Sequence, residues 1–464
     1  MNDLTKGSVP RHLVRLAVPI AIGMVFQTLY VLVDLYFVAK LGDAAIAGVG
    51  AAGNVQFIVM AATQILGVGS MALIAQAIGR RDRGDANLVF NQSLVLAAAC
   101  GVATLVFGYL LAPVYMGGLG ADAGTIAAGS RYLQWFMPGI ALQFALVSMG
   151  SALRGTGIVK PTMIVQMASV LLNAILDPIL IVGWLTGRPF GVAGAGLAST
   201  LSVAFAVVLM GLYFRRLETA VAVDPALVRP QLAVWKRILR IGLPPGGEFA
   251  LLFVYMAFIY WIIRDFGAAA QAGFGLGSRV MQSIFLPAMA VAFAVAPLAG
   301  QNFGAGNAAR VRETFRVSAW MGSAIMLALT LFCQWRPGAL IAAFTGEPAV
   351  IETGGQFLQV VSWNFVASGL VFTCSGMFQA TGNTLPALLS SASRLLTFVL
   401  PGLLLAGLPG FTLGRLWALS VTSVALQAAL SLFLVRAELA KRLPRLRPIE
   451  PAEELVPAPV APEL

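Results

Sequence analysis

Long apolar runs separated by short polar segments dominate the chain. A run of roughly 20 apolar residues is long enough to cross a bilayer as a helix. Twelve runs are expected to do so, at residues 13–38, 46–76, 88–112, 127–153, 161–186, 191–214, 238–263, 269–300, 314–336, 350–377, 386–408 and 412–436. The short connections between them are typical of a helical bundle. The pattern predicts an all-α membrane protein with twelve transmembrane helices.

The composition agrees with this prediction. Of 464 residues, 59% are hydrophobic and 11% are charged, whereas soluble domains carry roughly 25% charged residues. The mean hydropathy is +0.87. The first run contains Asp34 and shows no convincing small-residue cleavage site, so we expect it to remain as a helix and not to be removed as a signal peptide.

The basic residues indicate the orientation in the membrane. The net charge is +11, and most of the 30 Lys and Arg residues lie in the termini and the even-numbered connections. Lys and Arg accumulate in cytoplasmic loops, so both termini should be cytoplasmic, and the charge needs no nucleic acid to explain it. The brevity of the chain and its excess of Arg over Lys favour a bacterial inner membrane.

An internal repeat relates the two halves at a constant offset of 225 residues. The matches pair Pro19 with Pro244, Gly42 with Gly267, Gln76 with Gln301, Gly79 with Gly304, and Thr156-Gly157 with Thr381-Gly382. Such a constant register indicates duplication. Each half contains six spans, an even number, so the copies enter from the same side and form two six-helix lobes related by a parallel internal repeat.

The repeat and the polar segments divide the chain into five parts. A cytoplasmic N-terminus (1–12) precedes the N-lobe (13–214). A flexible basic linker (215–237) leads to the C-lobe (238–436). The remaining residues (437–464) form a cytoplasmic tail that is rich in Pro and acidic residues towards its end, and we expect it to be largely disordered.

Several classes of activity are not expected. His12 is the single histidine and precedes the first apolar run, so Ser-His-Asp catalysis, zinc hydrolysis and haem ligation lack a residue within the membrane. Cys100, Cys333 and Cys374 lie in apolar runs and suit the core. The chain has no phosphate-binding G-x-x-x-x-G-K-[S/T] motif. We therefore expect no enzyme and no cofactor, and transport would need an ion gradient or a partner.

A glycine motif within the second run also has a simpler explanation. Residues 48–53, with Gly48, Gly50 and Gly53, match the spacing of a dinucleotide-binding loop. That loop must follow a strand, whereas these glycines lie inside a predicted span. Close helix packing is therefore the favoured interpretation.

Acids inside the first lobe are the strongest functional signal, because an ionisable group in the bilayer is costly unless paired or hydrated. Tyr30 and Asp34 share one helix face, as do Asn173 and Asp177. Both acids should lie in the outer half of the bilayer, where they could share a proton or hold Na⁺ with Asn173. A structural polar contact is the alternative. Pro178 should interrupt the helix after Asp177.

The second lobe offers a different set of candidates. Glu248 and Arg394 are expected at similar depth, roughly 13 Å into their helices. They form either a structural ion pair or a substrate or coupling site. Tyr255 and Gln282 are further candidates for the same region, with ordinary packing as the alternative. Arg279 has no obvious acidic partner.

Four motifs in this order give the chain a family resemblance. They are Ala75-Gln76-Ala77-Ile78-Gly79-Arg80, Gly150-Ser151-Ala152-Leu153-Arg154-Gly155-Thr156-Gly157 with Pro161, Asn173-Ala174-Ile175-Leu176-Asp177-Pro178, and Gly300-Gln301-Asn302-Phe303-Gly304-Ala305-Gly306. With them the chain resembles the multidrug and toxic compound extrusion (MATE) transporters over about residues 10–440.

The resemblance implies an antiporter that exchanges H⁺ or Na⁺ for organic, often cationic, compounds by rocking two lobes about a central cleft. The family's first-lobe cation site corresponds here to Tyr30, Asp34, Asn173 and Asp177. The sixth-helix hydroxyl is either Ser199 or Thr200.

Coupling through the second lobe fits the family pattern less well. One branch of the family uses an acid on the seventh helix and another on the tenth. Glu248 stands one turn earlier than that pattern expects, and the tenth span offers neutral groups such as Asn364. The coupling carboxylates are therefore expected to be Asp34 and Asp177.

Two alternative functions remain open. One is a flippase of lipid-linked precursors from the same superfamily, towards which Arg279 and Arg394 point. The other is a non-transporting membrane scaffold or receptor. For the antiporter, the expected partners are the lipid bilayer and a small organic substrate, with no nucleic acid and with the protein as a monomer.

Overall fold

The computed structural model describes residues 3–119, 121–185, 187–216 and 221–446, and within these ranges it contains helices and no strand. The first half contains α1 (Val9–Ala39), α2 (Asp43–Gly79), α3 (Arg83–Gly117), α4 (Ala123–Gly155), α5 (Lys160–Asp177), the π-helix η1 (Pro178–Val182) and α6 (Val192–Arg216).

The second half begins with the short helix η2 (Pro225–Leu227). It continues with α7 (Leu232–Ile263), η3 (Arg264–Phe266), α8 (Ala268–Gly304), α9 (Ala308–Trp335), α10 (Pro337–Ala342), α11 (Pro348–Val361), α12 (Asn364–Thr381), α13 (Leu385–Ala406), α14 (Leu413–Arg442) and η4 (Leu443–Arg445). Eleven helices in the described ranges are long and apolar enough to cross a membrane. The pair α11 and α12, bent by 57°, makes a twelfth span. The predicted all-α architecture is confirmed.

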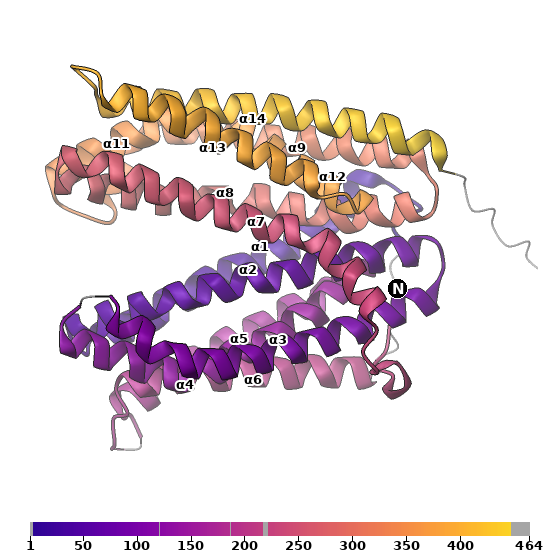
Figure 1. Ribbon diagram of the computed structural model, residues 1–464, viewed down its shortest axis with the longest axis horizontal. Helices are drawn as coiled ribbons and strands as arrows, with labels where there is room; N and C mark the ends of the chain where they lie inside the picture. Colours follow the sequence, from indigo (N-terminus) through magenta and orange to yellow (C-terminus); the bar gives the residue numbers. More distant parts are fainter. Residues whose placement is uncertain (1–2, 120, 186, 217–220, 447–464) are drawn as a thin grey trace, which may run out of the picture.

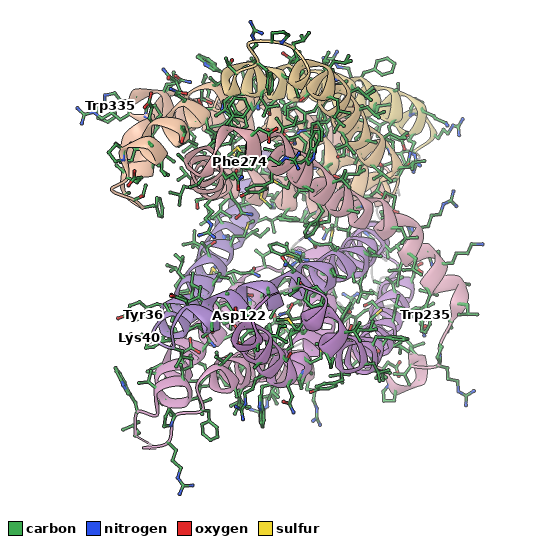
Figure 2. The ribbon with its side chains drawn as sticks, turned by 60° about the vertical axis from the view of Figure 1, so that its left-hand side comes forward. Tyr36, Lys40, Asp122, Trp235, Phe274 and Trp335 are labelled. Atoms are coloured by element: carbon green, nitrogen blue, oxygen red, sulfur yellow. The ribbon has the colours of Figure 1, made fainter. Side chains whose placement is uncertain are left out.

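The two halves form two groups of helices (Figure 1). The N-lobe, α1 to α6, is indigo to pink, and the C-lobe, α7 to α14, runs from pink to yellow. The N-terminus and the end of α14 lie at the same end of the molecule, which we call the terminal end. Figure 2 shows the lobes diverging away from it.

The lobes exchange the first turns of α1 and α7. Leu13 and Leu16 of α1 are buried with Leu298 of α8 and Phe378 of α12, in the core of the C-lobe. Conversely, Val234 and Ile238 in the first turns of α7 are buried in the core of the N-lobe. The sequence did not predict this exchange, because a hydrophobic pattern shows that a face is buried and not which helix covers it.

Glycines permit a close contact between the lobes at the terminal end. A Cβ atom on Gly79 would lie 2.0 Å from the Gln301 carbonyl oxygen, and one on Gly304 would lie 2.1 Å from the Gln76 carbonyl oxygen. The two glycines are related by the repeat. Any side chain there would force α2 and α8 apart.

The predicted glycine packing within the second span holds in part. A Cβ on Gly48 would lie 2.7 Å from the Thr125 carbonyl oxygen of α4, so this glycine does serve close helix packing. Gly50 and Gly53 have nothing within 4 Å of the corresponding position. For these two residues the packing interpretation is wrong in this conformation.

The described part of the linker is hydrogen-bonded to the N-lobe. Gln92 of α3 donates from Nε2 to the carbonyl oxygens of Leu227 and Arg229, both at 2.7 Å, and accepts from the Gln231 N–H at 2.8 Å. Asn91 donates to the Ala222 carbonyl at 2.9 Å. The described residues 221–231 are therefore attached to α3 of the N-lobe in this conformation, and the flexibility of the linker stays a prediction.

The start of the predicted C-terminal tail is helical. Helix α14 continues to Arg442, beyond the expected end of the span at residue 436, and η4 follows it. Residues 447–464, which include most of the Pro-rich tail, lie outside the described residues. The expected disorder of that segment stays a prediction.

Candidate functional site

Three helices, α1, α5 and α6, bring the predicted polar residues of the N-lobe together. Tyr30 and Asp34 lie one turn apart on α1, and the Tyr30 hydroxyl donates to Ser199 Oγ of α6 at 2.7 Å. On α5, Asn173 Nδ2 donates to Asp177 Oδ1 at 3.2 Å. Asn173, Asp177 and Ser199 are fully buried, and Asp34 is 8% exposed. The predicted residues thus form one buried cluster.

Three oxygens of this cluster lack a hydrogen-bond partner. They are Asp34 Oδ1, Asn173 Oδ1 and Asp177 Oδ2. The two carboxylates are also near enough to interact electrostatically. An unsatisfied buried acceptor costs about 1–3 kcal/mol, and more if charged. A proton or a hard cation would relieve that cost, because both are attracted to oxygen acceptors.

A Na⁺ ion at this position would need ligands in addition to the two carboxylates. The described part of the chain holds no group of three or more His, Cys, Asp or Glu side chains that could bind a metal. The Asn173 amide oxygen and the hydroxyls of Tyr30 and Ser199 would have to complete the coordination. The donor set, all oxygen, fits Na⁺ and does not fit a soft metal.

The backbone is irregular beside the acids, as Pro178 predicts. Asp177 is the last residue of α5, and the π-helix Pro178–Val182 follows it directly. Pro178 has no N–H to donate. Single turns of π-helix often occur at functional sites, because they displace side chains and carbonyls from the regular helix.

The structure distinguishes the two hydroxyl candidates of the sixth span. Thr200 Oγ1 donates to the Trp135 carbonyl at 2.6 Å and accepts from the Gly139 N–H at 3.2 Å, so it joins α6 to α4. Ser199 instead faces Tyr30. Of the two, Ser199 is the one that belongs to the cluster.

Sequence reasoning missed Tyr132 of α4. Its side chain is 6% exposed and lies against Ser199, close to the Asp34 carboxylate. A tyrosine in an apolar run carries no signal that distinguishes it from ordinary aromatic packing. The only available hint was its hydroxyl, which needs a partner when buried.

In the C-lobe the expected ion pair is not formed. Among the described ion pairs, none joins Glu248 to Arg394. Glu248 Oε2 instead accepts from Ser391 Oγ at 3.4 Å, and the Arg394 guanidinium lies 4.3 Å from the centre of the Tyr255 ring. Equal depth does not place two side chains on facing sides of their helices.

Other polar residues complete this C-lobe group. The hydroxyls of Tyr255 and Ser420 are 3.1 Å apart, and Asn364 Nδ2 donates to Ser420 Oγ at 3.4 Å. Gln282 is an exposed residue of α8, and within the described residues no hydrogen bond links it to the group. The structure therefore places Arg394 with Tyr255 and Glu248 with Ser391, and leaves Gln282 apart.

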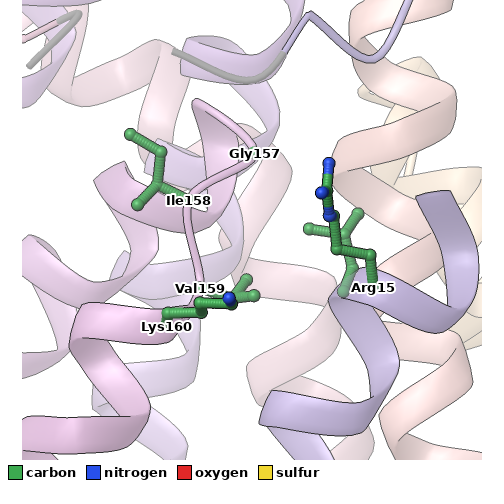
Figure 3. A pocket seen from close by; sticks show the side chains of 6 residues that line it. Arg15, Gly157, Ile158, Val159 and Lys160 are labelled. Carbon is green, nitrogen blue, oxygen red and sulfur yellow. The ribbon is translucent and has the colours of Figure 1, made fainter.

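A cavity of about 260 Å³ lies elsewhere, at the terminal end (Figure 3). It lies between Arg15 and Leu16 of α1 and the residues 157–160, which end at the first residue of α5. Arg15 and Asp34 are 19 positions apart on α1, which corresponds to about 28 Å along a helix. The cavity is thus distinct from the acid cluster.

Comparison with known proteins identifies the family. A family model described as MatE matches residues 19–179 and 244–405. The chain belongs to the MatE family. The two matches start at Pro19 and Pro244, so the family model finds the 225-residue repeat independently. Multidrug efflux and transport are the activities associated with this family, as the resemblance implied.

Relatives over almost the full length carry the same description. The multidrug export protein MepA of Staphylococcus aureus (strain N315) is 28% identical over 454 residues, covering 94% of this chain and 96% of that protein. MepA of Staphylococcus saprophyticus is 26% identical over 441 residues, with the same coverage.

Solved MATE structures share the fold. A multidrug resistance MATE family transporter in an outward-facing conformation superposes with a TM-score of 0.88 and 25% identity, covering 95% of this chain and 98% of that one. A MOP superfamily transporter from Pyrococcus furiosus Vc1 matches equally well, covering 94% and 97%. The description of that protein reports a binding pocket of reverse polarity that suggests a different function.

Proposed function

We propose that this protein is a secondary antiporter that exports organic, mainly cationic compounds in exchange for H⁺ or Na⁺. The observation that supports this function is the buried cluster in the N-lobe, where two carboxylates and one amide leave three oxygens without partners. Asp34 and Asp177 carry the coupling ion, and Tyr30, Asn173 and Ser199 orient it. No other cofactor takes part.

Coupling requires that the ion bind the two transport conformations with different affinity. The loaded cluster can remain buried, whereas the empty cluster carries two uncompensated carboxylates and favours rearrangement. The lobes then rock about the central cleft, so that their contact at the terminal end opens as the opposite end closes. The basic residues make the terminal end cytoplasmic, so the present conformation is open to the outside. The protein works as a monomer in a bacterial inner membrane.

Proteoliposomes with imposed pH or Na⁺ gradients test this proposal. We expect gradient-driven transport of a fluorescent cation by the wild type and its loss, by at least tenfold, in Asp34→Asn. Asp43→Asn is the matched control, because Asp43 is an exposed acid in the first turn of α2. Equal transport by both variants would refute the assignment of Asp34.

A lipid-linked precursor flippase is the second candidate. It is favoured by Arg394, whose guanidinium has no described ion pair in the middle of α13. A diphosphate headgroup would supply the missing anion. Movement of a fluorescent polyprenyl diphosphate across the same proteoliposomes, without transport of the organic cation, would favour this function over export.

A further inference from the structure

The cavity between α1 and α5 is lined by two basic residues and by no acidic one. Arg15 of α1 and Lys160, the first residue of α5, lie on its two sides (Figure 3). The rest of the lining is Leu16, Gly157, Ile158 and Val159. Among the described residues, no ion pair and no side-chain hydrogen bond involves either basic residue. Two positive charges thus share one cavity without a counter-charge from the described part of the chain.

The same cavity lies where the two lobes meet at the terminal end. Arg15 stands between Leu13 and Leu16, whose side chains are buried in the core of the C-lobe. Lys160 begins α5 of the N-lobe, and Val159 before it is buried against that same core. A ligand that held both basic residues would therefore join a segment packed on the C-lobe to a helix of the N-lobe.

Exposed apolar side chains flank both basic residues. Val14 and Val18 of α1 are 47% and 50% exposed, and Ile164, one turn after Lys160 on α5, is 58% exposed. Apolar side chains on the outer surface of a membrane protein lie against lipid, and basic side chains near helix ends reach the headgroups. The two charges are therefore placed where a phospholipid headgroup meets the protein.

Helix α9 marks the same level of the membrane. It packs against α1, and Arg310 in its first turn donates to the carbonyl of Gly7, just before α1, at 2.8 Å. The two helices therefore begin level with each other. On α9 the exposed Arg316 is followed one turn later by Trp320, which is 75% exposed. Because exposed tryptophans concentrate at the membrane interface, Arg15, the seventh residue of α1, lies at the headgroups.

We propose that Arg15 and Lys160 together bind the phosphate of an anionic phospholipid from the leaflet at the terminal end, and that this lipid holds the lobes together in the present conformation. The cavity of about 260 Å³ has the volume of several water molecules and accommodates a phosphate group. A guanidinium and an ammonium both bind phosphate oxygens strongly. Basic pockets between transmembrane helices recognise lipid headgroups in this way. The lipid is a bound component and not a transported one, so the proposal does not depend on the export function.

The repeat supplies a matched control for this site. Arg240 of α7 corresponds to Arg15 and is likewise exposed. The position that corresponds to Lys160 is Leu385, which carries no charge. Arg240 therefore stands at the equivalent place in the other lobe without the second cation, and its loss should leave lipid binding unchanged.

Lipid binding is measured on the full-length chain in non-ionic detergent, by the fluorescence anisotropy of phosphatidylglycerol or phosphatidylcholine labelled on an acyl chain. The wild type should bind phosphatidylglycerol at least tenfold more tightly, because the choline cation opposes the two basic residues. Arg15→Gln and Lys160→Gln should each weaken phosphatidylglycerol about fivefold, the contribution of one basic residue at a membrane surface. Arg15→Lys should keep most of the affinity, which shows that the replaced charge, and not a disturbed fold, causes the loss. Arg240→Gln should match the wild type.

The joining of the lobes has its own measurement. Spin labels at Gly84 and Ala309, exposed residues of opposite lobes at the terminal end, report the distance between the lobes in nanodiscs, with the native cysteines replaced. A change from phosphatidylcholine to an equal mixture with phosphatidylglycerol should raise the ratio of closed to open forms about fivefold or more in the wild type and in Arg240→Gln. The ratio should not change in the double variant Arg15→Gln with Lys160→Gln.

Three results would overturn the proposal. The first is an equal loss of phosphatidylglycerol binding in Arg240→Gln and Arg15→Gln, which would indicate a general attraction of the basic surface. The second is displacement of the labelled lipid by inorganic phosphate at comparable concentration, which would assign the cavity to a soluble anion. The third is an unchanged response of the lobe distance to phosphatidylglycerol in the double variant, which would mean that the lipid acts elsewhere.

Discussion

Gln76 and Gln301, which the repeat relates, join the two lobes through the same hydrogen bond made twice. Gln76 Nε2 of the N-lobe donates to the Ala380 carbonyl of the C-lobe at 2.8 Å, and Gln301 Nε2 donates back to the Gly155 carbonyl at 2.9 Å. The two acceptors are also 225 residues apart. The lobes are therefore closed at the terminal end by a symmetric pair of bonds that must break together if the lobes rock apart.

Removal of these bonds should shift the conformational equilibrium. A neutral hydrogen bond contributes about 0.5–1.5 kcal/mol, so Gln76→Ala with Gln301→Ala should raise the population open at the terminal end by roughly tenfold. Spin labels on cysteines at Gly84 and Ala309, in a background with the three native cysteines replaced, report the distance between the lobes. Both positions are exposed and are related by the repeat.

Two other residues near the same rim are unsuitable for the spin labels. Asp82 and Asn307 are also near the rim, but each caps the start of a helix, through the backbone N–H of Asp85 and of Arg310. Their replacement would disturb α3 and α9. An unchanged distance distribution in the double variant would mean that the glutamines do not hold the lobes together.

Crowding of the same contact should have a comparable effect. Gly79→Ala places a Cβ 2.0 Å from the Gln301 carbonyl oxygen, so it should destabilise the closed form by about 1–3 kcal/mol. Gly50→Ala is the control, because nothing lies within 4 Å of its Cβ position. Melting in detergent should fall for the first variant and stay constant or rise for the second. Equal melting would contradict the close approach.

Adjacent hydroxyls of α6 should have separable roles. Ser199→Ala removes the acceptor of the Tyr30 hydroxyl, so it should impair ion-driven transport and also lower the free energy of unfolding by about 1–3 kcal/mol. Thr200→Ala breaks two bonds to α4 and should lower the free energy of unfolding by about 1–2 kcal/mol while transport stays coupled. Transport rates at graded ion gradients therefore distinguish them, with thermal melts as the check that both proteins are folded. The reverse pattern would place Thr200 in the cluster.

The attachment of the linker to α3 can be tested by hydrogen exchange. Gln92→Ala removes three hydrogen bonds to residues 227–231, so the amides in this segment should exchange at least tenfold faster. Asn87→Ala, which removes the bond between its side chain and the Ala222 N–H, should affect the neighbourhood of residue 222 alone. Unchanged exchange in both variants would mean that the segment is held in other ways.

The sequence predicts most of the fold because bilayer and repeat both impose strong patterns. Apolar length locates the spans to within a few residues, and a constant offset of 225 defines the two halves. The exchange of the first turns of α1 and α7 could not be derived in this way. Leu16 and Ile238 are apolar residues on apolar helices. Leu16 is buried against residues of the C-lobe and Ile238 against residues of the N-lobe, and the hydrophobic pattern does not show which helix buries each.

The sequence predicts the residues of the site whose burial in a membrane costs free energy. It does not predict which neighbouring side chains face one another. Asp34 and Asp177 are conspicuous in any apolar run, and α-helical spacing adds Tyr30 and Asn173. Ser199 and Thr200 are neighbours, separated by about 100° around the helix, and one sequence without lobe geometry cannot choose between them. The predicted depths in the membrane placed Glu248 beside Arg394. In the structure Glu248 contacts Ser391 and Arg394 contacts Tyr255, so the ion pair does not form.

A double-mutant cycle at Glu248 and Arg394 examines that separation energetically. Because no ion pair joins them in this conformation, Glu248→Gln and Arg394→Gln should change the free energy of unfolding independently, with an interaction energy below about 0.5 kcal/mol. A buried pair would instead lose about 3–5 kcal/mol when one partner is removed and recover much of it in the double variant. Melting of the four proteins in detergent measures the cycle, with Ser391→Ala added to show whether Glu248 depends on its serine. A coupling of several kcal/mol would mean that the two charges meet in solution, which would leave the guanidinium occupied and unable to accept an anion.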